Sequence, residues 1–284
     1  MEKIIIIPNK KRDSSLSFTK DAVNMFSKDF AVCMPKDFEG LENAGFYEND
    51  RLFSCGAKLI ISLGGDGTIL TTASAMLPNC IPILGVNLGH LGFLTELEYS
   101  ELKNYYNDIV SGNYKIENRM MIEASIIRNN QTAGTFYALN DIVIARGALS
   151  RILHITTAID DCELNSFNAD GIIFSTPTGS TAYSLSAGGP IIAPEIEAIL
   201  VNAISPHNMS ARPIVIPPDK CLKVNAFDCS ESHAYLSADG RHGINLLNGD
   251  LITIKKSLYK TLLLRLKNSN FYETVRKKLN QRGI

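Results

Sequence analysis

Apolar residues gather in short blocks along the first 113 residues, and their spacing changes from block to block. Four runs rich in isoleucine, valine and leucine predict buried strands: residues 3–8, 30–35, 58–63 and 81–87. After the first run, an apolar stripe at four-residue spacing predicts a helix: Phe18, Ala22, Phe26 and Phe30. Ser14 or Ser15 is the expected cap of this helix.

Two further helices are predicted in this part of the chain. One covers residues 68–77 and ends before Pro78. The other lies within residues 99–112, with Ser100 as its cap and Gly112 just past its end. Such alternation of strand and helix predicts an open, mainly parallel sheet with helices on both faces.

After about residue 115 the pattern changes to short β-type runs separated by turn residues. The predicted strands are residues 121–128, 136–145, 152–159, 171–175, 212–216, 222–227 and 251–255. One helix is predicted within 194–203 and another over 271–279. The sequence therefore predicts an α/β domain at residues 1–114 and a second, β-rich domain at residues 115–261.

The composition is that of a packed globular protein. The chain has 284 residues, 45% hydrophobic and 20% charged, which corresponds to one large or two ordinary domains. Its net charge is −1 and it has no long run of one sign, so we expect no nucleic acid and no membrane partner. Only four consecutive apolar residues precede Pro8, too few for a signal peptide or a membrane span, and we expect a cytoplasmic protein.

Cysteine and histidine spacings give no sign of a metal centre. The six cysteines include no C-x-x-C pair, so we expect reduced thiols. The five histidines include no H-x-x-x-H or H-E-x-x-H arrangement, which argues against a zinc site. The metal that we expect is Mg²⁺, brought with a nucleotide.

One stretch joins a predicted strand to a predicted helix through glycines: S-L-G-G-D-G-T-I-L, residues 62–70. Such a corner binds anions, because free N–H groups and the positive end of the helix dipole point outward. The stretch lacks the lysine of a P-loop and does not match G-x-G-x-x-G. Asp66 stands at its tip, where a negative charge should repel phosphate. The stretch is either an anion site with an unusual carboxylate or a turn in which Asp66 caps the helix.

Three other stretches carry polar groups at predicted strand ends. Residues 87–95, with two glycines and Phe93, suit a nucleotide at the carboxyl end of a strand. Residues 175–186 concentrate serine and threonine hydroxyls at a strand-to-helix junction, which favours an anionic or sugar ligand over a capped helix alone. Asn140 and Asp141 interrupt an apolar strand, and they either bind a ribose diol or form an Asx turn.

In their order along the chain, these stretches resemble the motifs of the NAD kinases. The most specific is T-P-T-G-S-T-A-Y-S-L-S, residues 176–186, whereas the glycine-aspartate motif is shared with lipid kinases and phosphofructokinases. The resemblance covers nearly the whole chain. The matching stretches are residues 64–68, 139–141, 170–186, 188–190, 205–207, 212–217, 239–240 and 271–279.

The resemblance implies a fold and a reaction. It implies a Rossmann-like open α/β domain, a β-sandwich-like second domain, an active site between them, and a last segment, 262–284, that packs back on the first domain. The implied enzyme transfers the γ-phosphoryl group of ATP, or of polyphosphate in some members, to the 2'-hydroxyl of the adenosine ribose of NAD, giving NADP. It implies Mg²⁺ with ATP and a homo-oligomer, either a dimer or a tetramer.

The resemblance also implies roles for residues. Asp66 is the expected general base, which receives the proton of the attacking hydroxyl. Asn140 and Asp141 are expected to bind ribose hydroxyls, and Asp170 the base or the carboxamide end of the dinucleotide. Asp141 stands where many members have glutamate, and Arg241 where glutamine is common, which leaves the preference between NAD and NADH open. The remaining expected contacts are Gly65, Gly67, Thr68, Phe93, Arg151, Asn168, Thr178, Thr181, Ala182, Tyr183, Ser184 and Ser186.

Two alternative functions stay open from the sequence. A lipid kinase of the diacylglycerol-kinase type shares the glycine-aspartate turn, but it would need an apolar cleft, whereas residues 176–186 are rich in hydroxyls. A non-catalytic dinucleotide sensor on the same scaffold would not need a carboxylate at position 66. An assay of NADP formation from ATP, Mg²⁺ and NAD separates the three functions.

Overall fold

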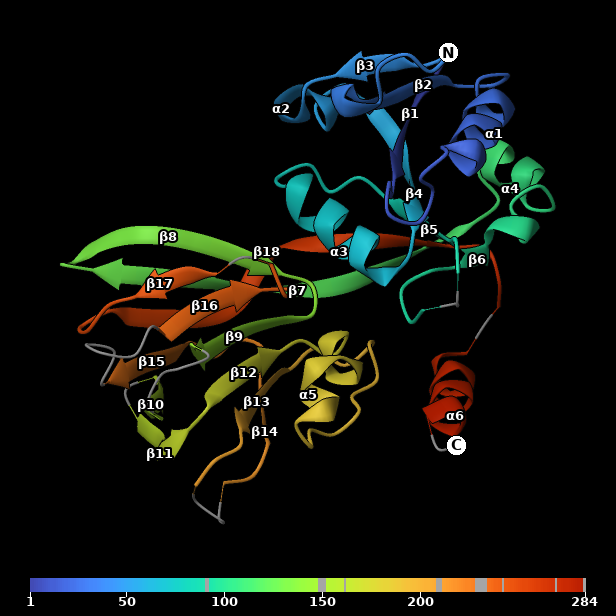
Figure 1. The fold of residues 1–284 in the computed structure, drawn as a ribbon. Coiled ribbons are helices and arrows are strands. Elements are labelled where there is room, and N and C mark those ends of the chain that lie inside the picture. The colour runs from blue at the N-terminus through green and yellow to red at the C-terminus, as the bar shows by residue number, and fades with distance from the viewer. Residues whose placement is uncertain are drawn as a thin grey trace. The chain divides into compact units, whose positions relative to one another are not determined.

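The protein divides into two compact units (Figure 1). The first comprises Met1–Asn118 and Thr261–Ile284, and the second comprises Arg119–Lys260. Two long strands, β7 (Lys115–Arg128) and β18 (Leu251–Arg265), contain residues of both units. The computed structural model describes residues 1–89, 92–147, 152–160, 162–207, 211–227, 234–241, 243–268 and 270–282.

The first unit is built on a parallel sheet in the order β3, β2, β1, β4, β5, and the end of β18 pairs with β5. The four predicted strands are confirmed, and the short strands β3 and β6 are additions. Strand order reverses between β1 and β4, the place where ligands bind in open sheets. The bounds are β1 (Lys3–Pro8), β2 (Ala31–Pro35), β3 (Gly45–Tyr47), β4 (Ala57–Gly64), β5 (Ile83–Asn87) and β6 (Leu97–Glu98).

Helices connect these strands, and two of their predicted ends are corrected. The first helix begins at Ser17, and its cap is not Ser14 or Ser15, because the Asp13 carboxylate accepts the N–H of Thr19 at 2.8 Å. The second predicted helix begins at Asp66, two residues earlier than expected. The helices are α1 (Ser17–Phe26), α2 (Asn49–Leu52), α3 (Asp66–Ala75), α4 (Tyr106–Ser111), α6 (Phe271–Arg282) and the 3₁₀ turns η1 (Lys36–Phe38) and η2 (Tyr99–Glu101).

The helix predicted within residues 99–112 is two separate pieces, η2 and α4. Ser100 is not its cap, since the side chains of Glu98 and Glu101 cap η2 reciprocally. Gly112 ends α4 in the left-handed conformation, with φ of 76°, as predicted.

Apolar side chains fix the strand ends of the first unit. Phe26 of α1 is fully buried in one core with Ile4, Ile6 and Leu63. Burial of such a side chain is worth about 1.5–3 kcal/mol, so the strands have little freedom to slide. The polar residues that follow β1, β4 and β5 are therefore held at one edge of the sheet.

The second unit is antiparallel. One sheet has the order β14, β13, β12, β9, β16, β17, and the other joins β11, β10, β15 and β18, with the β7–β8 hairpin beside β18. Both sheets contribute to one apolar core. The remaining bounds are β8 (Gln131–Ala138), β9 (Asp141–Arg146), β10 (Leu153–Ile159), β11 (Cys162–Ala169), β12 (Gly171–Ser175), η3 (Gly179–Thr181), α5 (Tyr183–Ser186), β13 (Ile199–Ile204), β14 (Ile214–Ile216), β15 (Leu222–Phe227), β16 (Ala234–Ala238) and β17 (Ile244–Leu246).

Two predictions for this unit are wrong. The helix expected within residues 194–203 is absent, because Ile199–Ile204 forms β13, paired on both sides with β12 and β14. A strand with two neighbours is apolar along its length and resembles a buried helix in sequence. The strand expected at 136–145 is two strands, β8 and β9, which leaves Leu139 and Asn140 in the turn between them.

Candidate active site

The glycine corner lies where β4 ends and α3 begins. The chain passes from Gly64 to Gly65, which is the N-cap of α3, and Asp66 is the first helical residue. A Cβ atom at Gly64 would lie 2.2 Å from the Thr68 hydroxyl oxygen, so only glycine fits under that side chain. A Cβ at Gly67 would meet nothing within 4 Å, and this side of the turn is open. The corner thus presents free backbone N–H groups at a ten-residue helix.

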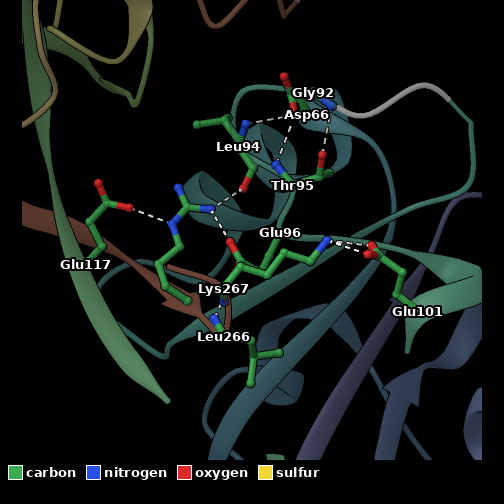
Figure 2. A network of polar contacts seen from close by, with 10 residues as sticks. Asp66, Gly92, Leu94, Thr95, Glu96, Glu101, Glu117, Leu266 and Lys267 are labelled. Carbon is green, nitrogen blue, oxygen red and sulfur yellow. Dashed lines mark hydrogen bonds and ion pairs between the residues drawn. The ribbon is translucent and has the colours of Figure 1, made fainter. Parts of the chain in front are cut away.

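The carboxylate of Asp66 is bound by a neighbouring loop (Figure 2). Its Oδ1 atom accepts the N–H groups of Leu94 at 3.1 Å and Thr95 at 3.3 Å. Its Oδ2 atom accepts the N–H of Phe93 at 2.8 Å. A Cβ at Gly92 would lie 1.9 Å from Oδ1, so the loop approaches closely only because residue 92 is glycine. The simple alternative, in which Asp66 caps its own helix, is wrong, since no side chain caps α3.

Three polar residues at the same strand ends were not predicted. Arg12 donates from Nη1 to the Gly64 carbonyl at 3.2 Å and to Asn87 Oδ1 at 3.1 Å. Asn9 donates to the Thr68 hydroxyl at 2.9 Å. Asn87 is 2% exposed, and its Nδ2 atom has no hydrogen-bond partner among the residues that the structure describes. Asn9 and Arg12 follow β1, and Asn87 is the last residue of β5. These positions at the carboxyl ends of strands could have identified the three residues in the sequence.

In the second unit, the turn between β8 and β9 is held by one carboxylate. Asp239 accepts the N–H of Leu139 at 2.9 Å, of Asn140 at 2.7 Å and of Asp141 at 3.2 Å. Asp239 itself has φ of 52° in the turn after β16, before Gly240 with φ of 67°. The Asn140 side-chain oxygen is buried, and no residue in the described part of the chain donates a hydrogen bond to it.

The charges in this turn perturb one another. Asp141 is 5% exposed, and burial, followed by the charge of Asp239, raises its pKa to about 7. Burial also raises the pKa of Asp239, against the lowering effect of the three backbone N–H groups and of Arg241. A carboxyl group that titrates near neutrality both donates and accepts hydrogen bonds, as a ribose hydroxyl requires.

Several hydroxyls of residues 175–186 already have protein partners, either within this stretch or in the turn between β8 and β9. Thr176 donates to the Leu139 carbonyl at 2.6 Å, and Ser180 to the Pro177 carbonyl at 2.6 Å. Thr181 donates to the Thr178 carbonyl at 3.2 Å. The concentration of hydroxyls is therefore partly structural, as in the capped-helix alternative. The exposed members are Tyr183, with 46% of its surface accessible, and Ser186, while Ser184 is buried and Ala182 is half-buried.

The other predicted contacts lie at the far end of β12. Asp141 pairs with Ser175 in the sheet, whereas Asp170 precedes Gly171, roughly 15 Å away at about 3.3 Å per residue. Asp170 accepts Nε of Arg146 at 2.6 Å, and Asn168 contacts His154 at 2.8 Å. The unit thus has two groups of candidate residues, one at each end of this strand. Arg151 lies outside the described residues.

The chain carries a carboxylate in a glycine corner and a turn with a buried acceptor oxygen, the features expected of a nucleotide-binding protein of the kinase type. The family model of the ATP-NAD kinase N-terminal domain matches residues 6–114, and that of the C-terminal domain matches residues 139–266. The NAD kinase of Caldanaerobacter subterraneus subsp. tengcongensis is 43% identical over 286 residues, 99% of this chain and 100% of the relative. The NAD kinase of Acetivibrio thermocellus is 37% identical, over 100% of this chain and 99% of the relative.

Solved structures share the fold. Yeast NADH kinase complexed with NADH has a TM-score of 0.87 and 26% identity, over 100% of this chain and 89% of that one. An NAD kinase from Archaeoglobus fulgidus in complex with ATP has a TM-score of 0.77 and 23% identity, over 99% of both chains. The chain belongs to the NAD kinase family and is an enzyme of that kind, which sets the lipid-kinase alternative aside. Among the described helices, none is long and apolar enough to cross a membrane.

Proposed function

We propose that the protein transfers the γ-phosphoryl group of ATP to the 2'-hydroxyl of the adenosine ribose of NAD, giving NADP. The family is that of the ATP-NAD kinases, and the curated relatives are named NAD kinases. The yeast relative was solved with NADH and the archaeal one with ATP, which supports both ligand classes here. The assay described below also tests polyphosphate as the phosphoryl donor and NADH as the acceptor.

The carboxylate of Asp66 carries this proposal, as the general base. Two oxygens offer roughly four acceptor positions, and three are used: two on Oδ1 and one on Oδ2. No described residue other than Phe93 donates to Oδ2, and its second position would accept the proton of the 2'-hydroxyl as the hydroxyl oxygen attacks phosphorus. The three backbone N–H groups hold the carboxylate in one orientation, which a positioned base requires.

The phosphate chain would lie at the N-terminus of α3. The backbone N–H groups of Gly65 and Gly67, at the start of α3, would bind the phosphates, and the Thr68 side chain would be a further contact, because the Thr68 N–H already donates to the Gly65 carbonyl at 2.9 Å. Arg12 would supply a positive charge, since its Nη1 atom lies 2.8 Å from the position that a Cβ at Gly65 would take. Among the described residues, no group of three or more His, Cys, Asp or Glu side chains could hold a metal ion. Mg²⁺ therefore fits as part of the ATP complex, held mainly by phosphate and water, where it would neutralise phosphate charge.

The second unit would bind the dinucleotide. Within the first unit, Phe93 is proposed as a nucleotide contact. Asn140 and Asp141 would bind ribose hydroxyls, because one offers an unused buried oxygen and the other titrates near neutrality. Tyr183 would offer an exposed ring to the adenine. Asp170, at the other end of β12, would contact the far end of the dinucleotide. The further contacts that we propose are Asn168, Thr178, Thr181, Ala182, Ser184, Ser186, Arg241 and Arg151.

The experiment incubates the purified protein with NAD, ATP and Mg²⁺ and measures NADP with an NADP-specific dehydrogenase. Parallel reactions replace ATP by polyphosphate or NAD by NADH. Formation of NADP with ATP is the expected result. Binding of NAD without NADP in any reaction would contradict the proposal and favour a dinucleotide sensor. Light scattering of the same sample tests the homo-oligomer, a dimer or a tetramer, that we propose from the family resemblance.

A further inference from the structure

Arg265, the last residue of β18, contacts the loop that holds Asp66 (Figure 2). Its Nη1 atom donates to the Leu94 carbonyl at 3.2 Å and to Glu96 Oε2 at 3.1 Å. Its Nε atom donates to Glu117 Oε2 at 2.6 Å. One guanidinium therefore joins three segments that lie far apart in the sequence, all within the first unit.

Glu96 is the buried centre of this network. Its side chain is only 2% exposed, and its Oε1 atom accepts the N–H groups of Leu266 at 2.8 Å and Lys267 at 2.6 Å. The other oxygen faces Arg265. A buried carboxylate is tolerated only when its charge is paired and hydrogen-bonded, so Arg265 and Glu96 fix each other's position.

The connection to Asp66 passes through a single peptide group. The carbonyl of Leu94 and the N–H of Thr95 belong to one planar trans peptide, in which they point in opposite directions. Arg265 binds the carbonyl, and Asp66 accepts the N–H. Because the plane is rigid, the guanidinium that fixes the carbonyl also fixes the direction of the N–H. A hydrogen bond at one end also polarises the peptide for the bond at the other.

We propose that Arg265 is a positioning residue for the phosphoryl-transfer step: it orients the residue 93–95 loop so that the Asp66 carboxylate faces the attacking hydroxyl. The inference rests on the proposed function, in which Asp66 is the base. The forked guanidinium is needed because three acceptors, from Leu94, Glu96 and Glu117, lie in different directions. A lysine would keep the charge beside Glu96 but not this geometry.

The test is Arg265→Lys, with Arg128→Lys as a matched control. Arg128 binds the buried carboxylate of Asp250 through Nε at 2.8 Å and Nη2 at 2.7 Å, in the second unit and without contact to a proposed site residue. Arg265→Lys should lower kcat about 30-fold while the KM values for NAD and ATP change less than about threefold, since small misplacements of a catalytic group cost up to about 100-fold. Arg128→Lys should leave kcat per folded molecule unchanged.

A double variant separates positioning from general stabilisation. In the Asp66→Asn background, Arg265→Lys should lower the residual rate less than about threefold, because the two residues act as one unit. A further 30-fold loss of rate in the Asp66→Asn background would overturn the proposal. A wild-type kcat for Arg265→Lys, with Asp66→Asn inactive, would also overturn it. Normal turnover of Asp66→Asn contradicts the proposed base instead. If Arg265→Lys does not fold, the isosteric variant Glu96→Gln takes its place. Glu96→Gln should lower kcat at least fivefold without changing KM. A wild-type kcat for this variant would overturn the proposal.

Discussion

Asp66 in the first unit and Asp239 in the second are held in the same way but do different work. Each carboxylate accepts three consecutive backbone N–H groups: residues 93–95 for Asp66 and residues 139–141 for Asp239. Asp66 is itself the proposed reacting group, so the loop positions the carboxylate. Asp239 instead holds the turn, and the groups proposed to bind the ribose belong to Asn140 and Asp141.

The difference teaches how each unit places a negative charge. The N–H dipoles around Asp66 face the charge that acts on the substrate. In the second unit those dipoles are used by Asp239, and Asp141 lies buried beside a second carboxylate, which raises its pKa to about 7. A carboxylate held in one orientation suits a positioned base, while a group that both donates and accepts suits a sugar hydroxyl. Four substitutions test this comparison.

Gly92→Ala should have the largest effect. The new Cβ would lie 1.9 Å from Asp66 Oδ1 and 2.2 Å from Cγ, so the carboxylate or the loop must move. We expect kcat to fall about 100-fold with little change in the KM for NAD, because a displaced base affects the chemical step. Gly45→Ala, whose Cβ would make only ordinary contacts at 3.5 Å, is the control in steady-state kinetics. Wild-type turnover of Gly92→Ala would show that the close approach does not position Asp66.

Arg12→Met should weaken the phosphate end of the first site. Loss of a charge-assisted contact is worth about 1.5–3 kcal/mol, so the KM for ATP should rise roughly 30-fold. The KM for NAD should change far less. Arg51→Met, at an exposed position on α2, is the matched loss of charge. An unchanged KM for ATP would remove Arg12 from the phosphate site.

Asp239→Ala should affect the second site alone. Three N–H groups lose their acceptor, and the turn that carries Asn140 and Asp141 loses its fixed geometry. We expect the KM for NAD to rise about tenfold, while the KM for ATP stays within about twofold. Asp239→Asn keeps one acceptor oxygen, so its KM for NAD in initial-rate measurements should lie between those of the wild type and Asp239→Ala. Equal effects on both substrates would mean that the two sites are not held independently.

Asp141→Asn should act on stability, in a way that depends on pH. A pKa raised from 3.8 to about 7 favours the folded state at low pH, and this contribution is lost as the pH rises through about 7. Asp141→Asn has no carboxyl group to ionise at this position and does not lose this contribution. The unfolding free energy of the variant minus that of the wild type should therefore increase by about 2–3 kcal/mol between pH 5 and pH 8. Urea titrations at both pH values measure it. A constant difference would show that Asp141 is already ionised at pH 5.

The sequence predicted the strands of the first unit well, because runs such as residues 58–63 are buried on both faces and have no competing pattern. It failed at β13, where an apolar run paired on both sides resembles a helix. Helix caps also differed: Asp13 reaches Thr19 across six residues, and no local rule relates residues at that spacing. In both cases, contacts with residues outside the local sequence decide which structure forms.

For the site, the sequence pointed to Asp66 and to Asn140 and Asp141, since polar residues inside apolar runs stand out. It did not show what holds them. Arg265, Glu96 and Asp239 act through backbone groups of residues far away in the chain, and those contacts exist only in the folded protein. It also overrated residues 175–186, where several hydroxyls are used by the turn itself.

The most direct test of the central claim is Asp66→Asn, measured for NADP formation and, by calorimetry, for NAD binding. If the carboxylate is the general base, kcat should fall by at least about 10³-fold, while the Kd for NAD stays within about threefold. A variant that binds NAD normally and turns over within about tenfold of the wild type would contradict the account.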